Sequence, residues 1–359
     1  MVTGENNIAD LSFGCIEEYR ESATSMKIRT PFKGLWCAAL WVFLAAISAI
    51  DHSEAQSKKV RVTIPGYTIA VLSFLAAKMN GYYTAEGLDV ELIAMRAPTA
   101  NVAVVSGSVE FSGVPLSGLT TALRGAPLKM LFCQNDRPQH VLFAKPDLQN
   151  LKALRGKKIA VVGPGAIDDV LLREVFSTNG IDGGKDATIL AIGAAETRFA
   201  ALASGAVDAA VLIAPFTFNA KEAGFKELVT FKDEGFVLPS GGIVARDELL
   251  KSDPVTVEKF VRTTLMGFLV ARDNRGAAIK VLSRSLKIEE PTAARIYDSA
   301  RPTMTTDGAL SEEAQKKVVS FVMKQAGAKE APPYEKLFDF SVIKKANATL
   351  QARGWHPGS

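Results

Sequence analysis

Apolar residues recur at two different spacings in the first half of the chain, and the two spacings alternate. Residues 58–64 (KKVRVTI) alternate and are β-branched, a pattern that predicts a strand. Residues 68–80 carry apolar side chains at helical spacing up to Asn80, and the following Gly81 favours a helix end. Residues 88–95 (LDVELIAM) predict the next strand. Strands that alternate with short helices are typical of an α/β protein with a largely parallel sheet.

The same alternation restarts near residue 140 and gives way to helices after Pro254. Residues 140–147 (HVLFAKPD) predict a strand, and residues 158–181 read as strand, glycine-rich loop and helix. Beyond Pro254 the apolar spacing is helical almost throughout, as in residues 255–274 (VTVEKFVRTTLMGFLVARDN). The pattern therefore predicts two α/β units in sequence, followed by a C-terminal helical tail.

The two units contain a similar sequence motif, a weak internal repeat. Residues 104–116 (VVSGSVEFSGVPL) and residues 201–216 (ALASGAVDAAVLIAPF) both read as helix, Ser-Gly, acidic residue, apolar strand and proline. Ordinary turn chemistry also explains each motif alone, because Ser-Gly commonly ends a helix and acidic residues are frequent in turns. Two copies in successive units favour two similar lobes.

The N-terminal segment has a third pattern. A basic flank after Met26 precedes the almost wholly apolar residues 35–50, and the stretch SEAQ that follows has small residues at Ser53 and Ala55. This order is typical of a secretory signal, and the apolar run is shorter than the ~20 residues that span a bilayer. We therefore predict that residues 1–55 form an N-terminal extension with a signal peptide cleaved after Ala55, and that the protein is periplasmic. An uncleaved anchor is the alternative.

Charge and composition narrow the class of partner. Without residues 1–55 the chain has 38 Lys/Arg and 31 Asp/Glu, a net charge of +7, which favours anionic partners through long-range steering. A solvated surface explains the same charge. Basic runs with interleaved aromatic residues do not occur, so we expect no nucleic-acid partner.

Cysteine and histidine usage argues against several kinds of site. Cys133 is the only cysteine after residue 55, so a disulfide within the mature chain is excluded. His140 and His356 are the only histidines there, and no Cys/His cluster has the spacing of a zinc site. The sequence has neither a G-x-S-x-G nucleophile elbow nor a P-loop. We expect no metal, no cofactor and no catalytic residues.

Six segments in order carry a family resemblance: FLAAKMNGYYTAEGLDVELI, SGSVEFSGV, RGAPLKML, LKALRGKKIAV, RFAALASGAVDAAVLIAPF and VEKFVRTTLMGFLVARDN. They resemble the markers of ABC-transporter substrate-binding proteins of the nitrate/sulfonate/taurine type, to which binders of thiamine pyrimidine precursors are related. The resemblance covers residues 60–275. It implies a type II periplasmic-binding fold, an α/β fold in which two lobes are joined by a two-strand hinge and enclose a ligand cleft.

On this resemblance, lobe one comprises residues 58–140 plus 241–355 with the helical tail, and lobe two comprises residues 145–236. The hinge is expected near residues 140–145 and 241–246. The implied function is the periplasmic solute-binding component of an ABC importer. It would be a monomer that delivers a small anionic organic solute to an inner-membrane permease with its ATPase. The alternatives are an enzyme on the same fold (a pyrimidine-precursor synthase or a menaquinone-pathway dehydratase) and a sensory binding module.

The expected ligand site lies in the loops that follow strands, because open α/β sheets bind ligands outside the carboxyl ends of their strands. Helix N-termini there attract anions. Arg198 is the predicted countercharge, Tyr67 and Phe216 an apolar wall, Ser117 a helix N-cap, and Asp168 a cap or the partner of an amine-bearing ligand. The predicted ligand-binding residues are Tyr67, Thr68, Ser117, Asn135, Gly165, Asp168, Arg198 and Phe216.

Overall fold

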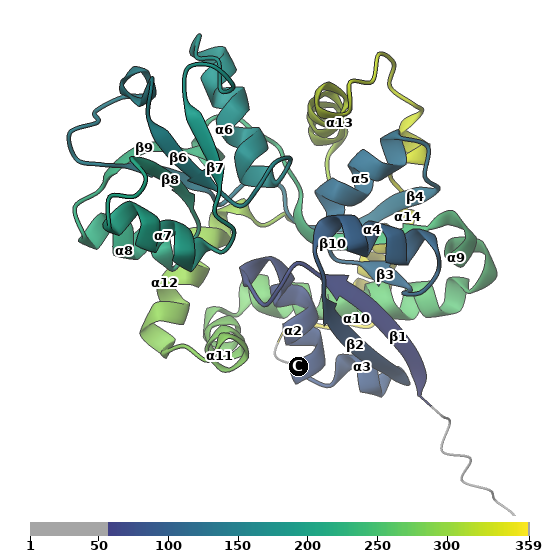
Figure 1. Cartoon of the computed structure of the whole chain (residues 1–359). Coiled ribbons are helices and arrows are strands. Elements are labelled where there is room, and N and C mark those ends of the chain that lie inside the picture. The colour runs from purple at the N-terminus through teal and green to yellow at the C-terminus, as the bar shows by residue number, and fades with distance from the viewer. Residues whose placement is uncertain (1–56, 358–359) are drawn as a thin grey trace, which may run out of the picture. The chain divides into compact units, whose positions relative to one another are not determined.

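The computed structural model describes residues 57–357, so the predicted signal peptide, residues 1–55, lies outside the described residues. The described residues belong to one compact unit that contains two five-stranded sheets (Figure 1). No helix within residues 57–357 combines the length and the apolar character needed to cross a bilayer.

The first sheet has its N-terminal strand near the centre, in the order β2-β1-β3-β10-β4. β1 pairs in parallel with β2 and β3, whereas β10 is antiparallel to β3 and β4. Its strands are β1 (Lys58–Ile64), β2 (Leu88–Ala94), β3 (Phe111–Ser112), β4 (Leu128–Asn135) and β10 (Ser240–Arg246).

The second sheet has the order β7-β6-β8-β5-β9. β6 is parallel to β7 and β8, and β5 is antiparallel to β8 and β9. Its strands are β5 (Val141–Ala144), β6 (Lys158–Val161), β7 (Thr188–Ala191), β8 (Ala209–Leu212) and β9 (Lys226–Thr230). In each sheet four strands therefore run in one direction and one strand, β10 in the first sheet and β5 in the second, runs antiparallel to them at the fourth position. The predicted two-lobe α/β fold is confirmed.

The two copies of the internal sequence repeat occupy equivalent places in the two sheets. Their apolar strands are β3 and β8, which hold the same central position in their sheets. The acidic residues of the two motifs also make the same contact. Glu110 Oε2 accepts a hydrogen bond from the backbone N–H of Arg61 at 2.7 Å, and Asp208 Oδ2 accepts one from Lys158 N–H at 2.9 Å. Each carboxylate therefore ties the segment that leads into the third strand of its sheet order (β3 or β8) to the neighbouring second strand (β1 or β6).

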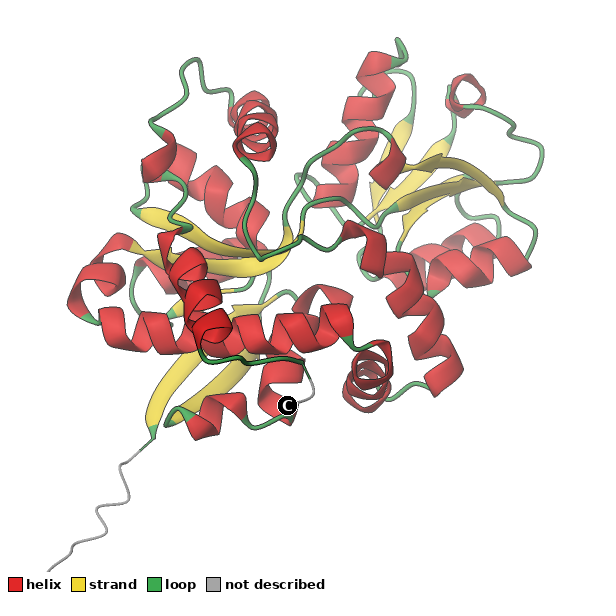
Figure 2. Cartoon of the chain, turned by 180° about the vertical axis from the view of Figure 1, so that it is seen from behind, coloured by secondary structure: helices red, strands yellow, loops and turns green. Residues whose placement is uncertain are grey.

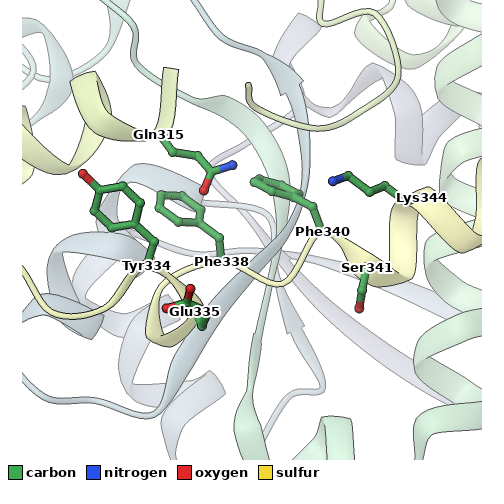
Figure 3. Close-up of a pocket in the computed structure, with 7 residues that line it drawn as sticks. All are labelled: Gln315, Tyr334, Glu335, Phe338, Phe340, Ser341 and Lys344. Carbon is green, nitrogen blue, oxygen red and sulfur yellow. The ribbon is translucent and has the colours of Figure 1, made fainter. Parts of the chain in front are cut away.

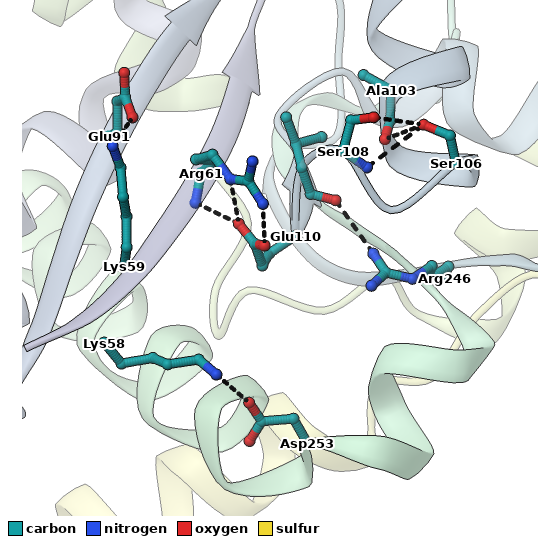
Figure 4. A network of polar contacts seen from close by, with 11 residues as sticks. Lys58, Lys59, Arg61, Glu91, Ala103, Ser106, Ser108, Glu110, Arg246 and Asp253 are labelled. Atoms are coloured by element: carbon teal, nitrogen blue, oxygen red, sulfur yellow. Dashed lines mark hydrogen bonds and ion pairs between the residues drawn. The ribbon is translucent and has the colours of Figure 1, made fainter.

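On the first sheet this contact belongs to a wider set of ion pairs along β1 (Figure 4). The guanidinium of Arg61 also holds Glu110, with Nη2 2.8 Å from Oε1. Lys58 Nζ lies 3.4 Å from Asp253, and Lys59 Nζ lies 3.0 Å from Glu91. The pKa of Glu110 is lowered because the bonds to Arg61 outweigh the cost of burial.

The chain crosses between the sheets twice. Residues 136–140 join β4 to β5, and residues 231–239 join β9 to β10. The sequence-based placement of the hinge at residues 140–145 and 241–246 is therefore wrong by several residues. Every residue of Val141–Ala144 is paired within the second sheet, and Ser240–Arg246 is paired within the first except at Gly241. The predicted hinge therefore fell on β5 and β10, which are strands inside the two sheets, and not on the segments that connect the sheets.

The helix after β1 packs tightly beneath the first sheet. It starts as η1 (Ile69–Val71), continues as α2 (Leu72–Met79) and lies against the long α10 (Pro254–Asp273). At Gly267 of α10, an added Cβ would lie 2.3 Å from the carbonyl oxygen of Ser73, so only glycine allows this approach. The aromatic pair that follows α2 belongs to the one-turn helix α3 (Tyr82–Ala85).

The aromatic pair, Tyr82 and Tyr83, packs against other parts of the first unit. The Tyr83 ring is buried and stacks on Phe260 with centroids 5.6 Å apart, and its hydroxyl lies 2.9 Å from Thr264 Oγ1. Tyr82 makes an edge contact with Trp355 at 6.0 Å.

The remaining helices fall into two sets, seen from behind in Figure 2. Those within the two α/β units are α4 (Ala97–Val105), α5 (Pro115–Leu123), α6 (Ile167–Thr178), α7 (Ala195–Ala203) and α8 (Phe216–Glu222). Those after β10 are α9 (Asp247–Ser252), α10, α11 (Arg275–Leu286), α12 (Glu290–Ala300), α13 (Glu312–Ala326) and α14 (Ser341–Ala352). Short turns η2 (Leu151–Leu154), η3 (Phe231–Asp233), η4 (Arg301–Thr303) and η5 (Tyr334–Lys336) complete the fold.

Two tail helices reach the second unit. Lys324 of α13 pairs with Glu174 of α6 at 2.6 Å, and Arg295 of α12 pairs with Glu222 of α8 at 2.7 Å. Arg295 also lies over the ring of Phe218, 4.3 Å from its centroid. The two units are therefore linked by side-chain contacts as well as by the two crossings.

Candidate functional site

The predicted loops follow the carboxyl ends of parallel strands in both sheets. In the first sheet they connect β1 to η1 and β3 to α5; in the second they follow β6, β7 and β8. Apolar contacts join the two sets. Leu116 of α5 packs against the core of the second sheet, while Ala214 and Phe218, after β8, pack against the core of the first. The loops after β3 and β8 therefore meet where the two units approach each other.

Arg198 of α7 is a deeply buried charge of the second unit, like Asp168 beside it. The Arg198 side chain is 2% exposed. Nε donates to the carbonyl of Val211 at 2.8 Å, and Nη1 donates to the carbonyl of Gly193. Nη2 lies 3.9 Å from Asp168 Oδ2, beyond hydrogen-bond distance, and makes no hydrogen bond to residues 57–357. Burial lowers the pKa of Arg198, and the nearby Asp168 opposes this shift.

Asp168 organises the loop between β6 and α6. Its Oδ2 accepts from the Val162 N–H at 2.7 Å and its Oδ1 from the Asp169 N–H at 3.0 Å. The pKa of Asp168 is raised chiefly by burial, against the effect of these backbone bonds and of Arg198. The prediction that Asp168 is a helix cap is wrong, because α6 begins at Ile167 with Ala166 at the N-cap position, and Asp168 lies in the first turn. Asp168 also lies beside Arg198, with Oδ2 3.9 Å from Nη2, and the sequence did not indicate this ion pair.

Gly165 lies in the same loop, and its backbone N–H is already engaged. It donates to Asp169 Oδ2 at 2.9 Å, while Asp169 Oδ1 accepts from Arg173 Nε at 2.7 Å. The structure thus joins Arg198 to Asp168 directly and brings Gly165 beside them through Asp169. A Cβ added at Gly165 would meet no other atom within 4 Å, so the space beside its Cα is open.

His140 is the residue of this region that the sequence prediction missed. It is the last residue of the first crossing, and its carbonyl accepts from the Phe231 N–H at 3.1 Å. Nδ1 is buried without a hydrogen-bond partner among residues 57–357. Burial, with a smaller contribution from the charge of Arg198, lowers the pKa of His140 to about 3, so the imidazole is neutral at physiological pH. The one available signal was the scarcity of histidine after residue 55.

The predicted polar residues of the first unit have separate partners. Thr68 Oγ1 caps η1 by accepting from the Ala70 N–H at 3.3 Å. Ser117 Oγ accepts from Asn101 Nδ2 at 2.6 Å. Asn135 is fully buried, and its Nδ2 donates to Thr303 Oγ1 at 2.8 Å.

The prediction that Ser117 is a helix N-cap is wrong. α5 begins at Pro115, and its N-cap position is Val114. Proline suits the first helical position because it lacks the N–H that would otherwise stay unpaired, so the helix starts two residues before Ser117.

The predicted apolar residues lie at the loop surfaces. Tyr67 is 53% exposed, and Val162 at the end of β6 is 45% exposed. Phe216 is partly exposed, with its ring 6.0 Å from that of Phe199. Exposed apolar side chains at strand ends suit contact with the apolar part of an organic ligand.

Two surface hollows lie away from these residues. One, of about 250 Å³, is lined by aromatic and polar residues from the segment before α14 and from neighbouring helices (Figure 3). Its lining is Gln315, Tyr334, Glu335, Phe338, Phe340, Ser341 and Lys344. The other, of about 410 Å³, lies between α14 and the start of α10 and shares Ser341. Neither contains a residue of the predicted site.

Within residues 57–357, no group of three or more His, Cys, Asp or Glu is placed to hold a metal ion.

Comparison with known proteins gives a family and a set of structural relatives. Residues 69–278 match the family described as NMT1/THI5 like. The riboflavin-binding protein RibY of Chloroflexus aurantiacus is 29% identical over 256 residues. That alignment covers 62% of this chain and 66% of RibY, just under two thirds of its length.

Solved structures agree in fold. A protein of Bordetella bronchiseptica superposes with a TM-score of 0.70 at 18% identity, covering 82% of this chain and 99% of that one. The alkanesulfonate-binding protein SsuA of Xanthomonas axonopodis, bound to MOPS, gives 0.62 at 19% identity over 80% and 97%. The desulfurization enzyme DSZB gives 0.63 at 15% identity over 81% and 99%. At these identities the likeness establishes the fold, which binding proteins and an enzyme share.

Proposed function

Because the chain belongs to the NMT1/THI5-like family, we propose that it is the solute-binding component of an ABC importer. It has the periplasmic-binding fold of sulfonate-binding importer proteins. In this proposal it captures a small anionic organic solute in a cleft between its two lobes and delivers it to an inner-membrane permease with its ATPase. The predicted lobes, residues 58–140 plus 241–355 and residues 145–236, are extended in this proposal by β5 (Val141–Ala144) in the second lobe and by Ser240 of β10 in the first.

The observation that carries the proposal is the free side of the Arg198 guanidinium. Two backbone carbonyls fix the group, and Nη2 retains its N–H donors. Asp168 does not use them, because both of its oxygens accept backbone N–H bonds and the nearest stands 3.9 Å away. A buried, oriented guanidinium with free donors suits a carboxylate or a sulfonate.

The other predicted residues complete the proposed site. Tyr67 and Phe216 would contact the apolar part of the solute, as their partial exposure allows. Thr68 and Ser117 would contribute polar contacts from the first lobe, and Gly165 would allow close approach at the second. The predicted Asn135 is fully buried, so it would lie behind these groups without a direct contact to the solute. We propose no metal and no cofactor.

Location and assembly follow from the same proposal. The signal peptide would be removed after Ala55 and the protein would act as a periplasmic monomer. N-terminal sequencing of the exported protein tests the cleavage, since an intact residue 26–55 segment in the membrane fraction would contradict it.

An enzyme on this fold is the second candidate, since DSZB shares the architecture. One observation favours binding over nucleophilic catalysis. Cys133, the free cysteine of the described residues, is fully buried, and burial raises the pKa of its thiol well above the usual value. A thiol in that state is a poor nucleophile, because the thiolate is the reactive form.

A thermal-shift screen tests the proposal. The panel contains alkanesulfonates, MOPS, nitrate, dicarboxylates, aromatic acids, pyrimidines and riboflavin. A ligand at a hundredfold excess over its Kd stabilises the folded state by about 2.7 kcal/mol. We expect an organic anion to raise the Tm. Shifts caused only by neutral or cationic compounds would overturn the anion assignment, and conversion of a compound to product would favour the enzyme.

A further inference from the structure

His140 stands beside Arg198 at the edge of the second sheet where the proposed site lies. It immediately precedes β5, whose first residue, Val141, pairs with Leu212 at the carboxyl end of β8. Arg198 is bonded to the carbonyl of Val211, one residue earlier in β8. The charge of Arg198 contributes to the low pKa of His140, as expected for neighbouring groups.

The two ring nitrogens of His140 have different surroundings. Nδ1 is buried and has no hydrogen-bond partner within residues 57–357. Nε2 makes no hydrogen bond there either, but the residue as a whole is partly exposed, and Nε2 is not one of the buried unpartnered atoms. Nε2 is therefore the nitrogen that solvent or a ligand can reach.

The surroundings of the two nitrogens favour one tautomer. A neutral imidazole has one N–H donor and one bare nitrogen that can only accept. An N–H at Nδ1 would be a buried donor without an acceptor among residues 57–357, whereas an N–H at Nε2 can bond to solvent or to a ligand. The proton then lies on Nε2, on the accessible side of the ring.

We propose that His140 is a ligand-binding residue of this cleft, donating its Nε2–H to one oxygen of the solute while Arg198 Nη2 donates to another. This inference rests on the proposed function and deepens it. Two fixed donors at neighbouring positions suit an oxyanion with at least two free oxygens, such as a sulfonate or a carboxylate. Arg198 comes from the second lobe and His140 from the crossing that leads directly into it, so this part of the site would exist before the lobes close.

The tautomer can be tested without a ligand. The exported chain, residues 56–359, contains only His140 and His356, so long-range ¹H–¹⁵N NMR of histidine-labelled protein gives two ring systems. A His356→Gln variant assigns them. We expect His140 as the neutral Nε2–H form from pH 5 to pH 8. An Nδ1–H tautomer, or an imidazolium at pH 6, overturns the inference.

The contact is tested with MOPS, methanesulfonate and riboflavin as probes on the same labelled protein. A probe that raises the Tm should also shift the His140 Nε2–H resonance. Calorimetry then compares His140→Phe, which keeps a ring without a donor, with His140→Gln, which restores an N–H. We expect a loss in affinity of about tenfold or more for His140→Phe and about threefold or less for His140→Gln.

The outcomes separate the two proposals. Unchanged affinity in His140→Phe, or a binding probe that leaves the Nε2–H resonance unmoved, overturns the role of His140 while the binding function stands. If neither these probes nor any compound of the wider panel binds the wild-type protein, the proposed function fails and the ligand contact fails with it.

Discussion

The guanidinium of Arg198 lies 3.9 Å from the carboxylate of Asp168, yet backbone groups rather than each other hold both side chains in place. Arg198 is bonded to the carbonyls of Val211 and Gly193, and Asp168 accepts two backbone N–H bonds. The charges compensate each other without a shared hydrogen bond. A solute oxygen can therefore bond to Arg198 without displacing Asp168.

Replacing Arg198 with alanine should affect both binding and folding. The change leaves the buried Asp168 without a countercharge and two carbonyls without a donor. Removing one partner of a buried ion pair costs about 3–5 kcal/mol, which urea unfolding would measure. Arg173→Ala is the matched control, since Arg173 pairs with Asp169 nearby but is 46% exposed and should cost under about 1 kcal/mol. Equal effects of the two substitutions would contradict the buried role of Arg198.

Ligand affinity gives a separate prediction for Arg198. Arg198→Lys keeps a charge but loses the fixed fork that reaches both carbonyls and an oxyanion. We expect this variant to bind the best anion of the screen with a loss of about 2–5 kcal/mol, measured by calorimetry on protein shown to be folded. Unchanged affinity would remove Arg198 from the site.

His140 should make stability depend on pH in one direction. Its pKa is about 3 in the folded protein and ordinarily 6.5, so between these values the unfolded chain binds the proton more readily. The free energy of unfolding should therefore fall as the pH drops from about 6.5 towards 3, and His140→Gln should reduce this slope. The raised pKa of Asp168 acts in the opposite sense in both proteins, so the comparison isolates His140. Identical slopes in urea unfolding would show that His140 is not buried as described.

The neighbouring tyrosines provide a test of the scaffold. Tyr83→Phe removes the hydroxyl that lies 2.9 Å from Thr264 Oγ1 in a buried position. The expected loss of stability is about 0.5–1.5 kcal/mol. Tyr82→Phe, one residue away, should change stability little, because the described contact of Tyr82 is the edge of its ring against Trp355. A larger effect at Tyr82 than at Tyr83 would reverse the assignment.

The ion pair between Lys324 and Glu174 should influence the separation of the lobes. Both side chains belong to helices of different units and lie 2.6 Å apart. Lys324→Glu places two like charges there, so small-angle scattering should give a larger radius of gyration than for the wild type. Adding Glu174→Lys restores an opposite pair and should restore the radius. The same radius of gyration in the wild type, the single variant and the double variant would mean that this contact does not couple the lobes.

Periodicity predicted the fold well because strands and helices impose different spacings on apolar residues. β1, β2 and α2 follow directly from alternation and helical spacing in their own segments. The crossings were misplaced because short apolar runs such as Val141–Ala144 do not reveal which sheet they join. That choice is made by pairing with β8 and β9, which are distant in sequence.

The site was harder to predict because its contacts are made by backbone groups. The sequence indicated Arg198 and Asp168 separately, but their proximity depends on the carbonyls of Val211 and Gly193 and on the fold of the β6–α6 loop. His140 was missed for the same reason. A lone histidine before a strand has no motif, and its importance comes from an unpaired nitrogen that only three-dimensional structure reveals.

The position of β10 sets an order for chain assembly. The second sheet is built from one continuous stretch, β5 to β9, whereas the first sheet is completed by β10, which lies between β3 and β4 but follows the whole second sheet in sequence. Pairing β10 requires closure of a loop that contains the entire second lobe, and such long-range pairing forms slowly. During synthesis from the N-terminus, the second lobe can therefore fold completely before β10 is available to fill its position between β3 and β4 in the first sheet.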